Sequence, residues 1–229
     1  MEHVTWGLIV ACGKSEQMSP EVDIPFLDLG GKPVLTYSLL AYEKCQEIDG
    51  IVLLVAKERI ESVQTMAQMF GCSKIRKVLA GSSHRQSSVT AGLKALDEDV
   101  TLVSVHEASR PCITPDLISE TVKATKRYGS GVAALQVPDV IKEVKKGLTV
   151  KETLDHHSLW AVQSPQTFRR EALVKGYDLA NRRKLSLEDD ASAIELLDKD
   201  EVHLIESQPR NFKIRTPDDL RNAAFLLHS

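Results

Sequence analysis

The chain has 229 residues, of which 27% are charged, and a formal net charge of −3 at pH 7. This length suits one large α/β domain or two small ones with a substantial buried core. The near-neutral charge offers no general basic surface for nucleic acid or an anionic membrane, and no apolar run approaches the roughly 18 residues of a membrane span.

Apolar runs alternate with amphipathic stretches from one end of the chain to the other. The runs rich in Val, Leu and Ile predict buried parallel strands at Trp6–Ala11, Ile51–Ala56, Thr101–Glu107 and Gly131–Val137. Helical patterns cover Val34–Cys45, Ile60–Met69, Ser87–Leu96, Pro115–Tyr128, Arg170–Asn181, Asp189–Leu197 and Pro217–Leu227. Thr216 is the predicted N-cap of the last helix. This alternation predicts a doubly wound, mostly parallel sheet in one domain over residues 1–229, with ligands beyond the carboxyl ends of the strands.

One segment, Pro138–Leu159, breaks this rhythm. It alternates polar and apolar residues around Lys146-Gly147, which predicts a β-hairpin instead of a crossover helix. We expect such a hairpin, at about residues 138–159, to project from the domain as an arm. An apolar face on a projecting arm favours a partner; a plain surface excursion is the alternative.

The cysteines and the start of the chain bear on the compartment. The four cysteines lie far apart, without a C-x-x-C pair or a nearby histidine pair, which argues against a zinc site and a dense disulfide framework. The start, MEHVTWGLIVACGK, has no basic region of the kind that opens a signal peptide. Both features favour a protein of the reducing cytoplasm.

Residues able to do chemistry follow the predicted strands. An acid able to bind a hard cation, small residues and several cations together predict a nucleoside triphosphate site. Taken singly, Glu107 is also typical of a helix cap or an ion pair, Arg110 of a surface charge and Lys213 of a solvated lysine. The candidates at the ends of predicted strands are Cys12, Gly13, Lys14, His106, Glu107 and Arg110, and those at or before the starts of predicted helices are Gly81, Arg85, Ser88, Lys213 and Arg215.

Several of these stretches resemble one family in their order and spacing. They are ACG near the start, GSSHRQSSV before a helix, VHEASRP after the third predicted strand, LWAVQSPQTF, DDASAIEL, and NFKI near the end. Over essentially the whole chain the sequence resembles the 2-C-methyl-D-erythritol 4-phosphate cytidylyltransferases of the non-mevalonate isoprenoid pathway. The resemblance implies a Rossmann-like sheet and a homodimer clasped through the arm. It also implies transfer of CMP from CTP to an alditol phosphate with release of pyrophosphate, assisted by Mg²⁺ or another divalent cation.

The resemblance also assigns roles to individual residues. It implies nucleotide contacts at Ala11, Cys12, Gly13, Gly81, Arg85 and Ser88, and acceptor contacts at His156, Ser164, Glu188 and Lys213. Glu107 stands where the family has a metal-binding aspartate, so its carboxylate is one methylene further from the backbone. Lys213 matches the lysine that positions the attacking phosphate, and Arg110 is retained.

The departures from the family pattern concern charges. The family loop reads roughly A-A-G-x-G-x-R-M and is followed by P-K-Q. In this chain Gln17 stands in place of the arginine, and Ile24 stands in place of the lysine. Loss of one such charge costs roughly 10³–10⁵ in rate, and Lys14 is the candidate replacement. His156 replaces an arginine that the family has in the arm, and Glu188 replaces a threonine that the family has near the acceptor phosphate.

Three functions therefore remain open. The chain is an active but divergent cytidylyltransferase, a catalytically impaired homologue that acts as a nucleotide-binding or scaffold dimer, or a cytidylyltransferase for another alditol phosphate such as ribitol 5-phosphate. A nicotinamide dehydrogenase is disfavoured because no G-x-G-x-x-G follows the first strand. The lysines of the arm are typical of a solvated face, not of a nucleic-acid site.

Overall fold

A seven-stranded sheet organises the computed structural model, which describes residues 3–12 and 22–228. Its strand order is β3-β2-β1-β4-β8-β5-β9. The strands are β1 Val4–Ala11, β2 Gly50–Val55, β3 Ile75–Ala80, β4 Val100–Glu107, β5 Ser130–Gln136, β8 Trp160–Arg169 and β9 Leu204–Glu206. Strands β1 to β4 pair in parallel, β8 runs antiparallel to both β4 and β5, and β9 is parallel to β5. The predicted mostly parallel sheet is confirmed.

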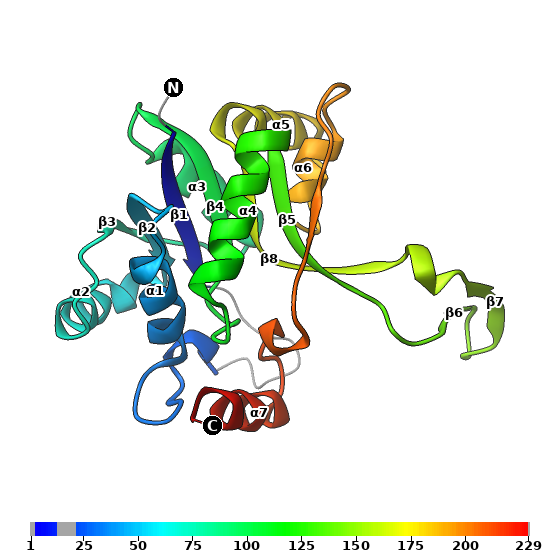
Figure 1. Ribbon diagram of the computed structural model, residues 1–229, viewed down its shortest axis with the longest axis horizontal. Helices are drawn as coiled ribbons and strands as arrows, with labels where there is room; N and C mark the ends of the chain where they lie inside the picture. Colours follow the sequence, from blue (N-terminus) through cyan, green and yellow to red (C-terminus); the bar gives the residue numbers. More distant parts are fainter. Residues whose placement is uncertain (1–2, 13–21, 229) are drawn as a thin grey trace.

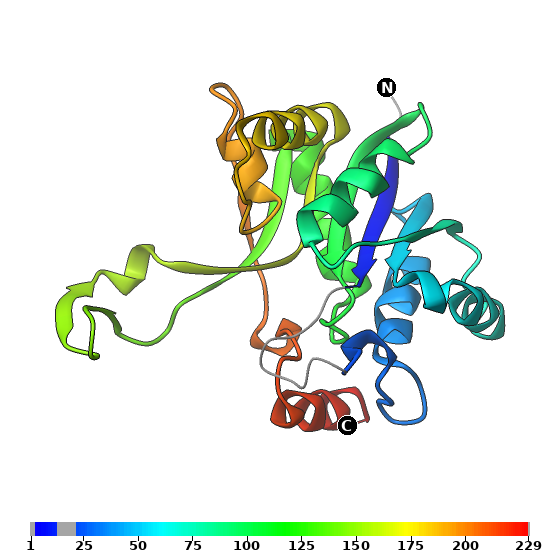
Figure 2. The same cartoon turned by 180° about the vertical axis from the view of Figure 1, so that it is seen from behind.

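Helices cover both faces of the sheet (Figures 1 and 2). The helices of the fold are α1 Val34–Lys44, α2 Ile60–Met69, α3 Arg85–Lys94, α4 Pro115–Tyr128, α5 Arg170–Arg183, α6 Ala191–Glu195 and α7 Pro217–His228. Residues of α1, α2 and α4 form one apolar core with one face of the sheet, and residues of α3, α5 and α6 form another core with the opposite face. The doubly wound arrangement therefore follows from strands that are apolar on both sides.

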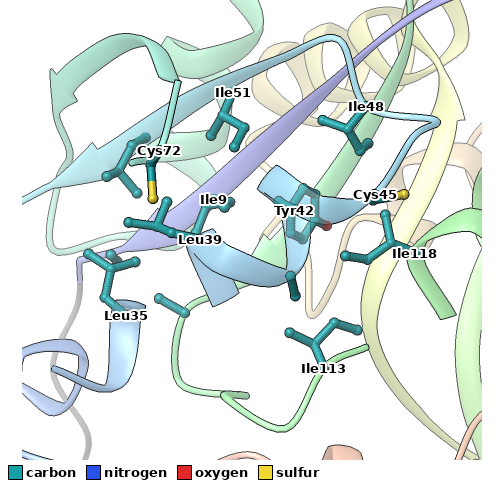
Figure 3. Close-up of a cluster of buried hydrophobic side chains, with 14 of the residues drawn as sticks. Ile9, Leu35, Leu39, Tyr42, Cys45, Ile48, Ile51, Cys72, Ile113 and Ile118 are labelled. Carbon is teal, nitrogen blue, oxygen red and sulfur yellow. The ribbon is translucent and has the colours of Figure 1, made fainter. Parts of the chain in front are cut away.

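The side chains of β1 show how one strand serves both cores. Leu8 and Ile9 are both fully buried, but successive side chains point to opposite faces, so Ile9 joins the first core and Leu8 the second. Figure 3 shows the first core, with Ile9 packed among residues of α1, including Leu39 and Tyr42. A continuous apolar run is the sequence signature of this two-sided burial.

The sequence pattern missed strands β3, β8 and β9. Strand β8 is the most informative because it lies in the middle of the sheet and is polar. Ser164, Gln166 and Thr167 are at most 3% exposed, and each has hydrogen-bond partners; for example, the Thr167 hydroxyl lies 2.9 Å from that of Thr121 on α4. Buried polar groups with partners are compatible with a central strand, but they remove the apolar signal on which strand prediction relies.

Two helices differ from their predicted bounds. The predicted helix Asp189–Leu197 is shorter, at Ala191–Glu195, because the Asp189 carboxylate accepts hydrogen bonds from the Ser192 backbone and hydroxyl and so stands before the helix. Helix α3 begins at Arg85, two residues earlier than predicted. The predicted cap of α7 is confirmed, since the Thr216 hydroxyl accepts from the Asp219 N–H at 3.2 Å.

The arm at residues 138–159 is a projecting hairpin, as predicted (Figure 1, right). Its strands β6 Ile141–Val144 and β7 Val150–Leu154 pair antiparallel and form a separate two-stranded sheet. Four large apolar side chains of the arm are between 46% and 83% exposed: Val140, Val144, Leu148 and Val150. The arm therefore presents apolar surface that its own chain leaves uncovered.

Two further features complete the fold. All four cysteines are free thiols. Within residues 3–12 and 22–228 none of the helices has the length and apolar character needed to cross a bilayer.

Candidate active site

A pocket of about 470 Å³ opens beside the carboxyl end of β4. It draws residues from the end of β4 and the turn that follows, from β8, from the start of α3, from α6 and the segment before it, and from the segment before α7. Its lining consists of Arg85, Glu107, Arg110, Val162, Gln163, Ser164, Gln166, Glu188, Asp189, Ser192, Glu195, Lys213 and Arg215. The location agrees with the rule that ligands of doubly wound sheets lie beyond the carboxyl ends of the strands.

Glu107 is the charged centre of this pocket. Its Oε1 lies 2.7 Å from Lys213 Nζ and 3.8 Å from Arg85 Nε, and its Oε2 lies 3.1 Å from Arg110 Nε. The Glu107 side chain is 16% exposed, and those of Lys213 and Arg85 are 32% and 28% exposed. Three cations converge on this one carboxylate, while Glu188, Asp189 and Glu195 line other parts of the pocket, so the positive charge is concentrated around Glu107 and does not extend over the whole lining.

The same charges set the protonation of Glu107. Burial by itself would raise the pKa of this carboxyl, but the charges of Lys213, Arg110 and Arg85 outweigh it and hold the pKa well below its usual range. Glu107 is therefore ionised at neutral pH and remains an acceptor for hydrogen bonds or a ligand for a cation.

Arg85 is bound to a buried acid as well as to Glu107. Its Nη1 donates to Asp190 Oδ1 at 3.1 Å, and its Nη2 donates to Asp190 Oδ2. Tyr177 donates its hydroxyl to the same carboxylate at 2.5 Å, and Asp190 is fully buried. Burial alone would lower the pKa of Arg85, but the charge of Asp190 raises it. This bidentate pair fixes the guanidinium at the wall of the pocket.

A chain of buried hydroxyls and an imidazole supports the backbone of Glu107. The Ser164 hydroxyl accepts from the Glu107 N–H at 3.0 Å and lies 3.0 Å from His106 Nδ1. The other ring nitrogen, Nε2, lies 3.1 Å from the Ser38 hydroxyl. Burial lowers the pKa of His106 to about 3, so this histidine is neutral at neutral pH.

Asn211 connects the segment before α7 to the pocket. Its side-chain amide donates to Gln163 Oε1 and to the Ser164 carbonyl, both at 2.8 Å, and its own carbonyl accepts from Arg110 Nη1 at 3.0 Å. These bonds place Lys213, two residues further on, at Glu107. Asn211 opens the NFKI stretch, yet sequence reasoning assigned no role to it, to Asp190 or to Tyr177.

Three of the predicted nucleotide-side residues, Cys12, Gly81 and Ser88, come together beside the end of β1, whereas Arg85 lies at Glu107. A side chain on Gly81 would place its Cβ 2.2 Å from Cys12 Sγ, so only glycine permits this approach. Ser88 is buried, lies 3.3 Å from Cys12 Sγ and accepts from the Ser82 N–H at 2.8 Å. Ala11 ends β1. Gly13 and Lys14, also predicted for this site, lie outside the described residues.

The predicted acceptor residues divide into two groups. Ser164, Glu188 and Lys213 line the pocket. His156 does not line it, because it belongs to a short 3-10 helix, His156–Ser158, at the base of the projecting arm. Within one chain the structure therefore brings together all the predicted acceptor residues except His156.

The donors of the pocket are compatible with Mg²⁺. An ionised carboxylate is the ligand type that Mg²⁺ prefers, and this ion is usually held by one or two carboxylates together with substrate phosphates. Both oxygens of Glu107 already face cations, which weakens the attraction for a metal ion alone. A metal ion accompanied by a triphosphate fits this charge distribution better.

The fold and the pocket together define an α/β protein with a charged pocket at the carboxyl edge of its sheet. The model of the 2-C-methyl-D-erythritol 4-phosphate cytidylyltransferase family matches residues 6–229. The chain belongs to this family, which confirms the resemblance in the sequence.

Relatives and solved structures agree with this assignment. The cytidylyltransferase of this name from Caldanaerobacter subterraneus is 33% identical over 96% of this chain and 97% of its own, and that from Alkaliphilus metalliredigens is 36% identical over 93% and 88%. A crystal structure of the Francisella tularensis enzyme covers 97% of this chain and 99% of its own, with 27% identity and a TM-score of 0.79. The 4-diphosphocytidyl-2C-methyl-D-erythritol synthase from Anaerococcus prevotii, 24% identical, shares the fold over 99% of both chains with a TM-score of 0.87.

Proposed function

We propose that this protein transfers CMP from CTP to 2-C-methyl-D-erythritol 4-phosphate. In this reaction a phosphate oxygen of the acceptor attacks the α-phosphorus of CTP. The bond from that phosphorus to the bridging oxygen breaks, and pyrophosphate leaves. The observation that carries the proposal is the position of Glu107 among Lys213, Arg110 and Arg85 at the carboxyl edge of the sheet, in a member of this family.

The three cations would act differently in this reaction. Arg110 is 6% exposed and is also bound to the Asn211 carbonyl, and Arg85 is bound to Asp190. Lys213 is the most exposed of the three and has a flexible side chain, so it would exchange Glu107 for the acceptor phosphate as the ligand binds. Mg²⁺, held by Glu107, would compensate the charge of the triphosphate when bound.

The position of the missing family lysine carries a different kind of residue here. Ile24 is 6% exposed and packs in an apolar cluster with Leu29, Val34, Ile214 and Ala223. A lysine cannot simply be restored at this position, because its ammonium would enter that cluster. The proposed reaction therefore depends on Lys213, on the two arginines and on Lys14.

A homodimer formed through the arm is part of the proposal. The exposed apolar residues of the arm need cover, and His156 lies outside the pocket of its own chain. In a dimer with exchanged arms, the arm of one protomer would extend over the pocket of its partner. Sedimentation of the purified protein at micromolar concentration tests this assembly: a monomer would contradict it.

The activity is tested by pyrophosphate release with CTP, Mg²⁺ and 2-C-methyl-D-erythritol 4-phosphate. We expect turnover that requires all three components. In Lys213→Met, kcat/KM should fall roughly 100- to 1,000-fold, whereas Lys199→Met, at an exposed lysine outside the pocket, should match the wild type. Binding of CTP without turnover on any acceptor would overturn the proposal and favour an impaired homologue.

Glu188 favours a second candidate, a cytidylyltransferase for another alditol phosphate. Its carboxylate lines the pocket on the predicted acceptor side, where it would repel a phosphate and attract hydroxyl groups. A panel of alditol phosphates that includes ribitol 5-phosphate separates the two activities. A higher kcat/KM for another alditol phosphate would replace methylerythritol phosphate as the proposed substrate.

A further inference from the structure

The base of the arm gathers three metal-binding side chains. Asp155, His156 and His157 follow one another in the chain, and one ligand atom from each lies within 4.8 Å of the other two. The two imidazole rings lie side by side, with centroids 4.3 Å apart. Two imidazoles and a carboxylate form a donor set that zinc, iron, nickel and copper accept.

The backbone of this turn is held in place by hydrogen bonds that leave both imidazoles and one Asp155 oxygen unused. His157 N–H donates to Asp155 Oδ1 at 3.1 Å, Leu159 N–H donates to the His156 carbonyl at 3.1 Å, and the Gln136 side chain donates to the His157 carbonyl at 3.0 Å. Asp155 therefore caps the turn with one oxygen and keeps the other available. The backbone of the turn is therefore fixed without using the imidazole nitrogens or the second Asp155 oxygen, which stay available for a metal ion.

The imidazoles themselves are available as ligands. In the part of the chain that the structure describes, the ring nitrogens of His156 and His157 take part in no hydrogen bond or ion pair. The two rings contact each other. The buried His106 behaves differently, because both of its ring nitrogens face hydroxyls. One half-buried and one exposed imidazole, both without hydrogen-bond partners among the described residues and next to a carboxylate, are consistent with a site that is completed by a ligand.

We propose that Asp155, His156 and His157 bind a divalent transition metal ion of the zinc class. Zn²⁺ binds nitrogen and oxygen at about 2.0–2.2 Å, which sets donors about 3–3.5 Å apart. Rotation of exposed side chains brings donors from within 4.8 Å to that separation. Three protein ligands leave a coordination position open to water or to an oxygen of a ligand.

The bound ion would reverse the charge of the turn. With neutral imidazoles the three side chains carry one negative charge, and a divalent ion changes this to one positive charge. The consequence for catalysis rests on the proposed function: in the exchanged-arm dimer, the ion would present a positive charge and an open coordination position to the acceptor phosphate in the partner's pocket. This would supply at position 156 the charge that the sequence otherwise lacks there.

Metal titration of the untagged, chelator-treated protein tests the site. We expect calorimetry to show one Zn²⁺ bound per chain, and Co²⁺ to give visible absorption bands of nitrogen and oxygen coordination. In the double variant His156→Gln, His157→Gln, affinity should fall by more than the roughly 10- to 100-fold that loss of an outer-shell partner costs. Asp155→Asn, which keeps an oxygen for the cap, should weaken binding less.

His3→Gln is the matched control, since it removes an exposed histidine far from the arm in sequence. It should bind Zn²⁺ as the wild type does. Unchanged stoichiometry and affinity in the double variant, or no Zn²⁺ binding by the wild type, would overturn the site. These substitutions are at exposed or half-buried positions, so thermal unfolding should stay close to that of the wild type.

Turnover measurements separate this inference from the proposed function. If both hold, Zn²⁺ lowers KM for the acceptor in the wild type and has no effect in the double variant. Zn²⁺ binding without any turnover would contradict the proposed function and leave the metal site standing. Turnover with a KM indifferent to Zn²⁺ in both proteins would remove the catalytic role of the site.

Discussion

The pocket and the arm differ in whether their side chains find partners within the same chain. In the pocket, Glu107 and Arg85 have ion-pair partners within the same chain, and His106 and Asn211 are buried with hydrogen bonds. In the arm, the apolar side chains are exposed, and the imidazoles at its base contact each other. A single chain therefore pairs the main charged groups of its pocket but leaves the apolar groups of its arm uncovered. Groups that are satisfied internally should control folding, and groups that are left open should control assembly and ligand binding.

Removing the charge of Asp190 should have the largest effect on folding. Asp190→Asn leaves the Arg85 guanidinium without its buried counter-ion, which costs about 3–5 kcal/mol of unfolding free energy. Urea unfolding followed by circular dichroism measures this cost. Asp178→Asn, at an exposed acid of α5, is the control and should change little. A cost under about 1 kcal/mol for Asp190→Asn would show that this pair is not a buried ion pair in solution.

A lysine at position 24 should destabilise the protein, although the family loop has a lysine at the corresponding position. Ile24→Lys removes a buried aliphatic side chain from its cluster and introduces an ammonium, which costs about 2–5 kcal/mol. Chemical denaturation measures the loss, and pyrophosphate release measures any gain. An Ile24→Lys variant with unchanged stability and raised turnover would contradict the structural role assigned to Ile24.

The neutral His106 should make stability fall as the pH drops. Its folded pKa of about 3 lies below the unfolded value of about 6.5, so below pH 6.5 the unfolded chain binds the extra proton. Stability is unaffected above pH 6.5 and falls by about 2 kcal/mol between pH 6.5 and 5. His106→Gln should be less stable at pH 7.5 but lose this slope, whereas His3→Gln should retain it. Equal slopes in the wild type and His106→Gln would refute the neutral state.

The smallest effect on folding is expected in the arm. Val144→Lys, the same chemical change in kind as Ile24→Lys, replaces a side chain that is 46% exposed and should alter the free energy of unfolding of the monomer by less than about 0.5 kcal/mol. If the arm holds the proposed dimer, the variant should sediment as a monomer or dissociate at higher concentration. A variant that dimerises as the wild type does would place the dimer contact elsewhere.

The sequence by itself determined many of the local elements and the charged centre of the pocket. Apolar runs such as those of β1 and β4 predict strands because burial on both faces requires them, and Glu107, Arg110 and Lys213 were located because ligands of such sheets meet strand ends. The hairpin at residues 138–159 was readable from its alternation and its Lys146-Gly147 turn. These are features of neighbouring residues.

Only the tertiary structure decided which residues distant in the sequence form pairs and which residues are buried. Arg85 and Asp190 are 105 positions apart, and Glu107 and Lys213 are 106 positions apart, so no local pattern pairs them. The polar strand β8 lies in the middle of the sheet because its partners, such as Thr121 on α4, come from elsewhere in the chain. Ile24 is recognised as a core residue, and His156 as lying outside the pocket of its own chain, only once the chain is folded. The physical reason is that burial and charge pairing depend on proximity in space, which a one-dimensional pattern does not contain.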